Sequence, residues 1–151
     1  MDNLTPEHRR KNMQNIRAVN TKPELLIAKE LRKLKIYFAR NVKTILGKPD
    51  FVFRRKKVAV FIDSDFWHGH PRRCIMPKSN LSYWQSKIER NRQRDKAVNK
   101  QLKSMGWHII RIWEYDVKKN IGKSVKKIIS AINAGTTKAI MVKKPWTLSI
   151  F

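Results

Sequence analysis

Three aspartates lie close together in a chain that has few acidic residues. Asp50, Asp63 and Asp65 fall within sixteen positions, whereas the whole chain holds only 11 Asp and Glu against 35 Lys and Arg. A carboxylate is costly to bury unless it is paired or binds a cation. Two carboxylates that converge beside a basic surface suit Mg²⁺, which prefers oxygen ligands, lowers the pKa of a bound water and shields a phosphate under attack. The pattern therefore favours a Mg²⁺ site that includes Asp50 and Asp63.

Each of these acids also has a purely structural interpretation. Asp50 follows a Gly-Lys-Pro sequence, which is typical of turns. Asp63 and Asp65 are alternatively caps or salt-bridge partners in an Arg-rich loop. Glu24 stands three residues after Thr21, at the spacing of a capping box, and is otherwise an outer acid of the metal site. The succession of Gly-Lys-Pro-Asp, two strands and Asp-Ser-Asp favours the metal site over these alternatives.

A histidine follows directly after the acidic stretch. His68 titrates near neutral pH, so it is a candidate general acid or base. His70 and Cys74 have side chains of the types that bind zinc, but they supply only two of the four ligands of a closed zinc site. We therefore expect no zinc.

Large aromatic residues flank this histidine in the sequence. Phe66 and Trp67 stand in a polar, irregular stretch, and Trp84 is near the start of a long predicted helix. Aromatic side chains in a loop of a basic protein can stack on bases or wedge between base steps. The alternative is that these rings pack in the core, with Trp84 on the buried face of its helix.

The long predicted helix carries basic residues on several faces, with only two acids among them. Such a helix is ordinarily a solvated surface. In this chain it is also a candidate for contact with phosphates, through Lys87, Arg90 and Arg94.

The elements that position these residues follow from apolar periodicity and from helix start and stop signals. Helices are predicted over residues 5–18, 21–35, 82–105 and 116–133, and strands over 36–38, 50–53, 58–62 and 107–113. Residues 51–62 form a predicted hairpin that brings Asp50 and Asp63 to the same end. The order helix–helix–β–β–β–helix–β–helix predicts an α/β fold of the α+β type, a mixed sheet flanked by helices.

Composition sets the class of partner and the size of the fold. The formal charge of +24 indicates a polyanion, because Lys and Arg gain affinity by releasing counterions from phosphates. With 41% hydrophobic residues in 151, the chain can form one modest core, which excludes a disordered polycation. No apolar run approaches the roughly 20 residues that span a bilayer, so we expect no membrane anchor and no secretory signal. A single cysteine indicates a reducing, cytoplasmic compartment.

A set of segments matches one known family in order and spacing. The segments are RKNMQNI at 10–16, NTKPE at 20–24, GKPDFV at 47–52, VFIDSDFWHGH at 60–70, YWQSKIERN at 83–91, RD at 94–95 and the stretch from GW at 106–107 to WE at 113–114. Over about residues 8–134 the chain therefore resembles the very short patch repair (Vsr-type) DNA mismatch endonucleases.

The resemblance implies a restriction-endonuclease-like core and Mg²⁺-dependent nicking of the strand next to a mismatched thymine in a T·G pair. It assigns the principal metal ligand to Asp50, a further metal position to Asp63 and a backbone carbonyl ligand to Ile62. His68 matches the catalytic histidine of the family, and Glu24 matches an acid of its site.

The resemblance also implies how the DNA is held. Phe66, Trp67 and Trp84 match aromatic residues that wedge beside the mismatch from the major groove, and Met13 matches an N-terminal arm that enters the minor groove. Asn91 lies in a matching segment, and we expect it to contact DNA together with Lys87, Arg90 and Arg94.

The chain departs from its better-known relatives at a structural zinc site. Two of the cysteine positions are occupied here by Asp65 and Tyr115. The resemblance therefore predicts a variant without zinc, in which another interaction, such as a hydrogen-bond or salt-bridge network of Asp65, holds the loop.

The leading hypothesis is a Mg²⁺-dependent mismatch endonuclease with a DNA-contacting arm (1–20), a nuclease domain (21–134) and a basic tail (135–151). We expect a monomer that acts on double-stranded DNA with a T·G mismatch in the bacterial cytoplasm or nucleoid, with a functional link to a DNA cytosine methyltransferase. The alternatives are a nuclease of the same fold with another mismatch or sequence specificity, and a non-catalytic basic protein that binds DNA or RNA.

Overall fold

Two helices precede the first three strands of the chain, which a computed structural model describes over residues 5–15 and 20–147. The helices are α1 (Pro6–Asn15), α2 (Lys22–Lys33), α3 (Leu81–Ser104), α4 (Glu114–Lys119) and α5 (Ile121–Thr147), with a short 3₁₀ helix at Arg54–Lys56. The strands are β1 (Ala39–Arg40), β2 (Phe51–Phe53), β3 (Val58–Asp63) and β4 (His108–Trp113). None of the helices in these ranges is both long and apolar enough to cross a membrane.

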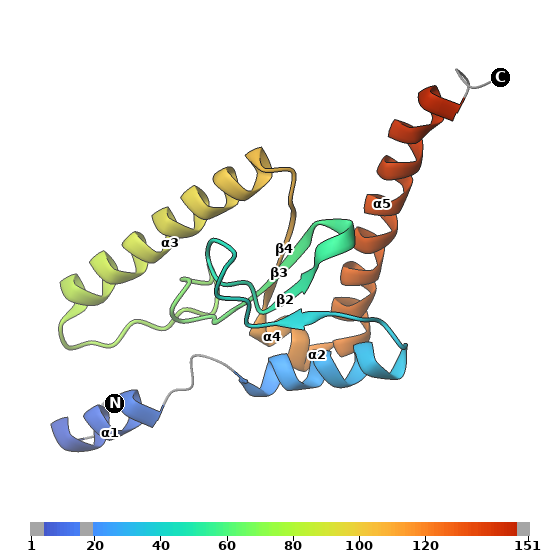
Figure 1. Cartoon of the computed structure of the whole chain (residues 1–151). Helices are drawn as coiled ribbons and strands as arrows, with labels where there is room; N and C mark the ends of the chain where they lie inside the picture. Colours follow the sequence, from blue (N-terminus) through green and yellow to red (C-terminus); the bar gives the residue numbers. More distant parts are fainter. Residues whose placement is uncertain (1–4, 16–19, 148–151) are drawn as a thin grey trace.

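The four strands form one sheet in the order β1-β2-β3-β4 (Figure 1). β2 pairs antiparallel with β1 and with β3, whereas β3 and β4 run parallel. The β2–β3 hairpin turns through the 3₁₀ helix and through Lys57, which has the left-handed φ of 50°. The mixed sheet flanked by helices and the hairpin over 51–62 are both confirmed.

Side chains alternate across β3 and so build a core on each face of the sheet. Val58 and Val60 pack with buried residues of α2, α4 and α5 on one face. Ala59 and Phe61 pack with Val98 of α3 on the other face. Figure 1 shows the same arrangement, with α2, α4 and α5 gathered on one side and α3 crossing the other. The continuous apolar run of β3 is therefore explained by burial on both faces.

The prediction of a strand at 36–38 is wrong, because the strand lies at Ala39–Arg40. Helix α2 ends at Lys33, Lys35 follows with φ of 57°, and the Ile36 N–H donates to the carbonyl of Leu31 at 3.1 Å. This hydrogen bond uses residues 34–36 to close the helix. Strand pairing therefore starts only at Ala39.

The predicted helix at 116–133 is divided and longer than expected. α4 starts at Glu114, directly after β4, and Asn120, with the non-helical φ and ψ of −150° and 86°, separates it from α5. The Asn120 side chain then accepts the N–H of Lys123 at 3.1 Å, which caps the start of α5. α5 continues to Thr147, so the tail expected at 135–151 is helical through that residue.

One helix start also needs correction, and one predicted helix extends beyond the described residues. α3 begins at Leu81, and the expected capping box of Ser82 and Gln85 is replaced by Asn80 in a left-handed conformation without a side-chain cap. α1 ends at Asn15 within the described residues, and positions 16–18 of the predicted helix lie outside them.

Candidate active site

Asp50 stands at the start of the hairpin, and its backbone and side chain both bind β3. Its N–H donates to the carbonyl of Val60 at 2.9 Å, and its Oδ2 accepts the N–H of Ile62 at 2.7 Å. Burial, together with the neighbouring carboxylates of Glu24 and Asp63, raises the pKa of Asp50 to about 7, against the opposing effect of the Ile62 hydrogen bond. The residue is thus a partly buried acid with other acids nearby.

Glu24 binds the residues that precede α2, but the expected capping box is not formed as predicted, because Thr21 makes no side-chain cap and Glu24 accepts from Asn20 instead of the Thr21 N–H. It is buried at the start of α2, where it accepts the N–H of Asn20 at 3.0 Å and the hydroxyl of Thr21 at 3.1 Å. Its Oε2 also lies 3.6 Å from the guanidinium of Arg40. The carboxylate that closes the helix start also raises the pKa of Asp50, so it belongs to the same group of acids.

Asp63 ends β3 and binds an arginine that the sequence did not single out. Its Oδ1 accepts from Nη1 of Arg111 at 2.8 Å. Burial raises the pKa of Asp63, although the charge of Arg111 opposes this. Asp63 is therefore a buried carboxylate with a fixed cationic partner, so the salt-bridge interpretation applies to it beside any role in a metal site.

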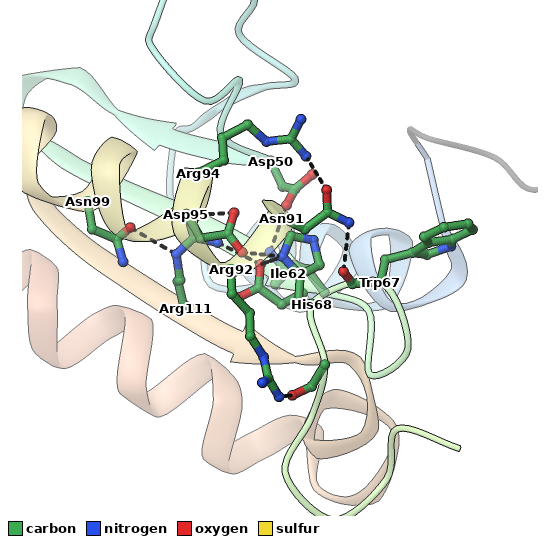
Figure 2. A network of polar contacts seen from close by, with 12 residues as sticks. Asp50, Ile62, Trp67, His68, Asn91, Arg92, Arg94, Asp95, Asn99 and Arg111 are labelled. Atoms are coloured by element: carbon green, nitrogen blue, oxygen red, sulfur yellow. Dashed lines mark hydrogen bonds and ion pairs between the residues drawn. The ribbon is translucent and has the colours of Figure 1, made fainter. Parts of the chain in front are cut away.

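His68 is held by a second unpredicted residue, Asp95 of α3 (Figure 2). Nδ1 of His68 lies 2.6 Å from Oδ2 of Asp95 and 3.7 Å from Oδ1 of Asp63. Burial alone would lower the pKa of His68, but the hydrogen bond with Asp95 and the two negative charges raise it. Burial alone would raise the pKa of Asp95, but the hydrogen bond with His68 and the nearby positive charges lower it. The pair is an acid–histidine couple of the kind that orients a ring for proton transfer.

A signal for Asp95 was present in the sequence. It is one of only two acids on a helix crowded with Lys and Arg, as is Glu89, and its helix follows the loop that carries His68. Periodicity alone did not show which of the two acids faces the loop.

The predicted metal ligands fit a Mg²⁺ ion in chemical type. Two carboxylates, Asp50 and Asp63, and the backbone of Ile62 lie at one end of the hairpin, and a partly buried acid with a raised pKa is stabilised by a nearby cation. In the described part of the chain, no group of three or more His, Cys, Asp or Glu side chains is arranged to hold a metal. A site with one or two carboxylates matches Mg²⁺, which keeps several waters and shares a phosphate.

The loop aromatics form a partly exposed cluster rather than part of the core. The ring centroids of Phe66 and Trp67 lie 5.1 Å apart, and Trp84 lies 5.4 Å from Phe66 and 5.8 Å from Trp67. Tyr83 packs on Trp84 at 5.1 Å, and Nζ of Lys87 lies 5.0 Å from the Trp67 ring. The core-packing alternative is therefore wrong for Trp84, which belongs to this aromatic cluster.

The expected DNA contacts on α3 differ in what they bind within the protein. Nδ2 of Asn91 donates to the carbonyl of Trp67 at 2.9 Å, and its Oδ1 accepts from Arg94 at 2.9 Å (Figure 2). Asn91 therefore holds the aromatic loop, whereas Arg90 and Arg94 are exposed on the helix. Met13 falls in α1, but its side chain lies outside the described part of the structure.

The loop at the zinc position makes several side-chain contacts of its own. His70 packs edge-on against Trp113 at 4.7 Å, and its Nδ1 accepts the N–H of Arg73 at 3.2 Å. The Arg73 guanidinium lies 3.0 Å from the centre of the Tyr115 ring. A hydrogen-bond or salt-bridge network of Asp65 was expected to hold this loop, and for its Oδ1 atom that expectation is wrong. The atom is buried and has no hydrogen-bond partner among the described residues.

Comparison with known proteins gives consistent similarities. A family model described as "DNA mismatch endonuclease Vsr" matches residues 1–74. The chain is 45% identical over 134 residues to the type II nicking enzyme V.NmeDIP of Neisseria meningitidis serogroup C, covering 87% of this chain and 90% of that protein. It is 48% identical over 135 residues to the type II nicking enzyme V.HpaIIP of Haemophilus parainfluenzae (87% and 96%). It is 30% identical over 109 residues to the DNA mismatch endonuclease Vsr of Escherichia coli strain K12 (70% and 69%).

Proposed function

The chain belongs to the Vsr family of DNA mismatch endonucleases and is therefore an enzyme that nicks DNA, and from this premise we propose that it nicks one strand beside the mismatched thymine of a T·G pair with the help of Mg²⁺. Its mixed sheet with flanking helices agrees with the restriction-endonuclease-like core of this family. The observation that best supports the proposal is the convergence of Asp50, Asp63 and the His68–Asp95 pair beside a partly exposed aromatic cluster.

Asp50 and Asp63 would hold the Mg²⁺ ion together with the carbonyl of Ile62. When bound, this ion would polarise the scissile phosphate and lower the pKa of a water. The other groups contribute through their own chemistry. Asp95 binds Nδ1 of His68 at 2.6 Å, which leaves Nε2 as the ring atom that exchanges a proton with the reacting water or the leaving group. Glu24 supports Asp50 from the start of α2.

The aromatic cluster of Phe66, Trp67, Tyr83 and Trp84 would recognise the lesion. Unstacking costs least at a mismatched step, so rings that insert between bases favour a mismatch over a paired duplex. The carbonyl of Trp67 is fixed by Asn91, which ties the cluster to the same helix that holds Asp95 and His68. Recognition and cleavage would therefore be positioned by one element, α3.

We also propose that the enzyme acts as a monomer and is linked in function to a DNA cytosine methyltransferase. Deamination of 5-methylcytosine opposite guanine yields a T·G pair, so such a methyltransferase would create the sites at which this substrate arises.

A panel of end-labelled duplexes tests the proposal. One strand carries thymine opposite G, A, C or T in varied flanking sequences, and each duplex is incubated with Mg²⁺ or with EDTA. We expect a single nick beside the thymine of T·G duplexes, with Mg²⁺ only. Nicking confined to another mismatch or to a paired sequence would favour the alternative nuclease, and no metal-dependent nicking of any duplex would favour a DNA-binding protein.

A further inference from the structure

Arg111, in the middle of β4, joins three elements of the site through one guanidinium (Figure 2). Nη1 donates to Asp63 of β3 at 2.8 Å, and Nη2 lies 3.6 Å from Oδ1 of Asp95 of α3. Nε donates to Oδ1 of Asn99, one turn further along α3, at 2.9 Å. The guanidinium also lies over the Phe61 ring, with its central carbon 4.3 Å from the ring centre.

We propose that Arg111 is a positioning residue for strand nicking, which fixes Asp63 and Asp95 beside Nδ1 of His68 by binding both carboxylates at once. The inference rests on the proposed role of His68 and Asp95 in nicking, and it adds a residue to that site.

The first support is the arrangement of like charges. Asp63 and Asp95 both approach Nδ1 of His68, at 3.7 and 2.6 Å. Two carboxylates that share a neighbour repel each other and would move apart or take up a proton. A cation between them removes this repulsion, and Arg111 lies within 4 Å of both. The groups facing His68 from β3, α3 and β4 are thus two carboxylates and one guanidinium.

The second support is the choice of arginine. Its planar fork presents several donors in fixed directions, whereas a lysine presents a single point charge on a flexible stem. Here the fork uses Nη1, Nη2 and Nε for three partners, and Phe61 supports its face. Asn99 thereby fixes the orientation in which the guanidinium reaches both carboxylates. If Arg111 only neutralised the two carboxylates, neither its three donor contacts nor the support of the Phe61 ring would be needed.

The third support is the place of Arg111 on its strand. Ile110 and Ile112 on either side are buried against the α2, α4 and α5 layer, so the backbone of β4 is firmly packed. β4 pairs in parallel with β3, where Arg111 stands opposite Phe61. Because Arg111 stands on this rigid sheet, it fixes the loop residue His68 and the α3 carboxylate Asp95 relative to the sheet.

The test compares Arg111→Gln and Arg111→Lys with a charge-matched control, Arg55→Gln. Arg55 is exposed in the turn of the hairpin, at the end away from Asp50, and its substitution also removes one positive charge. The substrate is a duplex that the wild type nicks. Single-turnover nicking is measured at saturating Mg²⁺ over a range of enzyme concentrations, which separates the nicking rate constant from the DNA affinity. Circular dichroism and thermal unfolding report the fold of each variant.

We expect Arg111→Gln to lower the nicking rate constant by about 100-fold, the loss typical of a misplaced catalytic group, with the DNA affinity close to that of Arg55→Gln. Arg111→Lys should recover only part of the rate, because it restores the charge without the fork. The double variant with Asp95→Asn should be no slower than the slower single variant, since both changes release His68. If Arg111→Gln does not fold, Arg111→Lys and Asn99→Ala carry the same test.

Several outcomes would overturn the inference. These are a rate constant for Arg111→Gln within about two-fold of that of Arg55→Gln, full recovery by Arg111→Lys, or multiplicative effects of Arg111→Gln and Asp95→Asn. The wild-type reaction separates this failure from that of the proposed function. If the wild type nicks and the variants behave as the control does, only the role of Arg111 is wrong. If the wild type nicks no duplex, the proposed function itself fails.

Discussion

The residues of the site show how a very basic protein holds a small group of buried and partly buried acids. Asp50, Asp63 and Asp95 are each held by a different partner: a backbone N–H, a guanidinium and a histidine ring. Asp50 is the one for which burial raises the pKa to about 7. A partly buried carboxylate in this environment is unfavourable for folding, and a divalent cation would relieve that cost.

Asp50 should therefore make the metal-free protein less stable as the pH rises. Its pKa is about 7 in the folded state, against the ordinary value of 3.8, so the folded state binds more protons than the unfolded state between these values. Because the slope of stability with pH follows that difference, the free energy of unfolding falls as the pH rises from about 4 to about 7.

In EDTA at pH 8, Asp50→Asn should exceed the wild type in free energy of unfolding by about 1–3 kcal/mol, since one pKa unit corresponds to about 1.4 kcal/mol. The asparagine keeps an acceptor for the N–H of Ile62. Urea titrations at pH 4, 6 and 8 check this, with the exposed Asp116→Asn as the matched control. A wild type as stable as Asp50→Asn at pH 8 would contradict the electrostatic account of this residue.

Individual residues of the site differed in how well the sequence predicted them. Asp50, Asp63 and His68 were predictable because they lie near one another in the chain, beside turn and strand signals. Asp95 and Arg111 are 27 and 48 positions from the residues they bind, His68 and Asp63. In the sequence, Arg111 in its strand and Asp95 in its basic helix resemble ordinary surface residues. They reach the site only through the pairing of β3 with β4 and the packing of α3.

At the scale of elements, the hairpin and the loop after it carry the site. The antiparallel pairing of β2 with β3 puts Asp50 beside Ile62, and the loop returns His68 to Asp63. Gly69 permits this return: it has φ of +64°, and a Cβ there would lie 2.7 Å from side-chain atoms of Ile88 and Arg92. The loop then packs directly against α3.

The loop aromatics should decide the preference for a mismatch. Trp67→Ala should lower the ratio of nicking at T·G to nicking at T·A by about 10-fold, because base–aromatic stacking contributes roughly 1–3 kcal/mol. Tyr37→Ala removes a ring that is 95% exposed next to β1, away from this loop, and should leave the ratio unchanged. Competition between the two duplexes in one reaction measures the ratio directly. Equal discrimination by Trp67→Ala and the wild type would count against the wedge.

Element boundaries were predictable where a local signal decides them. β3 has a continuous apolar run that is typical of a buried strand, and β4 is apolar apart from His108 and Arg111. The strand expected at 36–38 and the single helix expected at 116–133 failed because local hydrogen bonds decide them: Ile36 closes α2, and Asn120 caps α5. The sequence pattern gives no clear sign of either hydrogen bond.

At the scale of the whole molecule, the net charge of +24 should govern affinity without deciding specificity. Removing one side chain that binds a phosphate should reduce the slope of log affinity against log salt by about one. Arg90→Gln, on the exposed side of α3, should therefore weaken binding to matched and mismatched duplexes equally. Lys126→Gln, exposed on α5 across the sheet from α3, is the control and should change neither slope nor affinity. Unequal weakening on the two duplexes would assign Arg90 to mismatch recognition.

The proposed function depends most on Asp50, the partly buried acid that would make a basic DNA-binding surface into a metal-dependent nicking site. Single-turnover nicking of a T·G duplex by the wild type and by Asp50→Asn, in Mg²⁺ and with DNA binding measured in parallel, tests it most directly. We predict that Asp50→Asn folds, binds the duplex with the salt dependence of the wild type and gives no detectable nick. Undiminished nicking by Asp50→Asn would contradict the account.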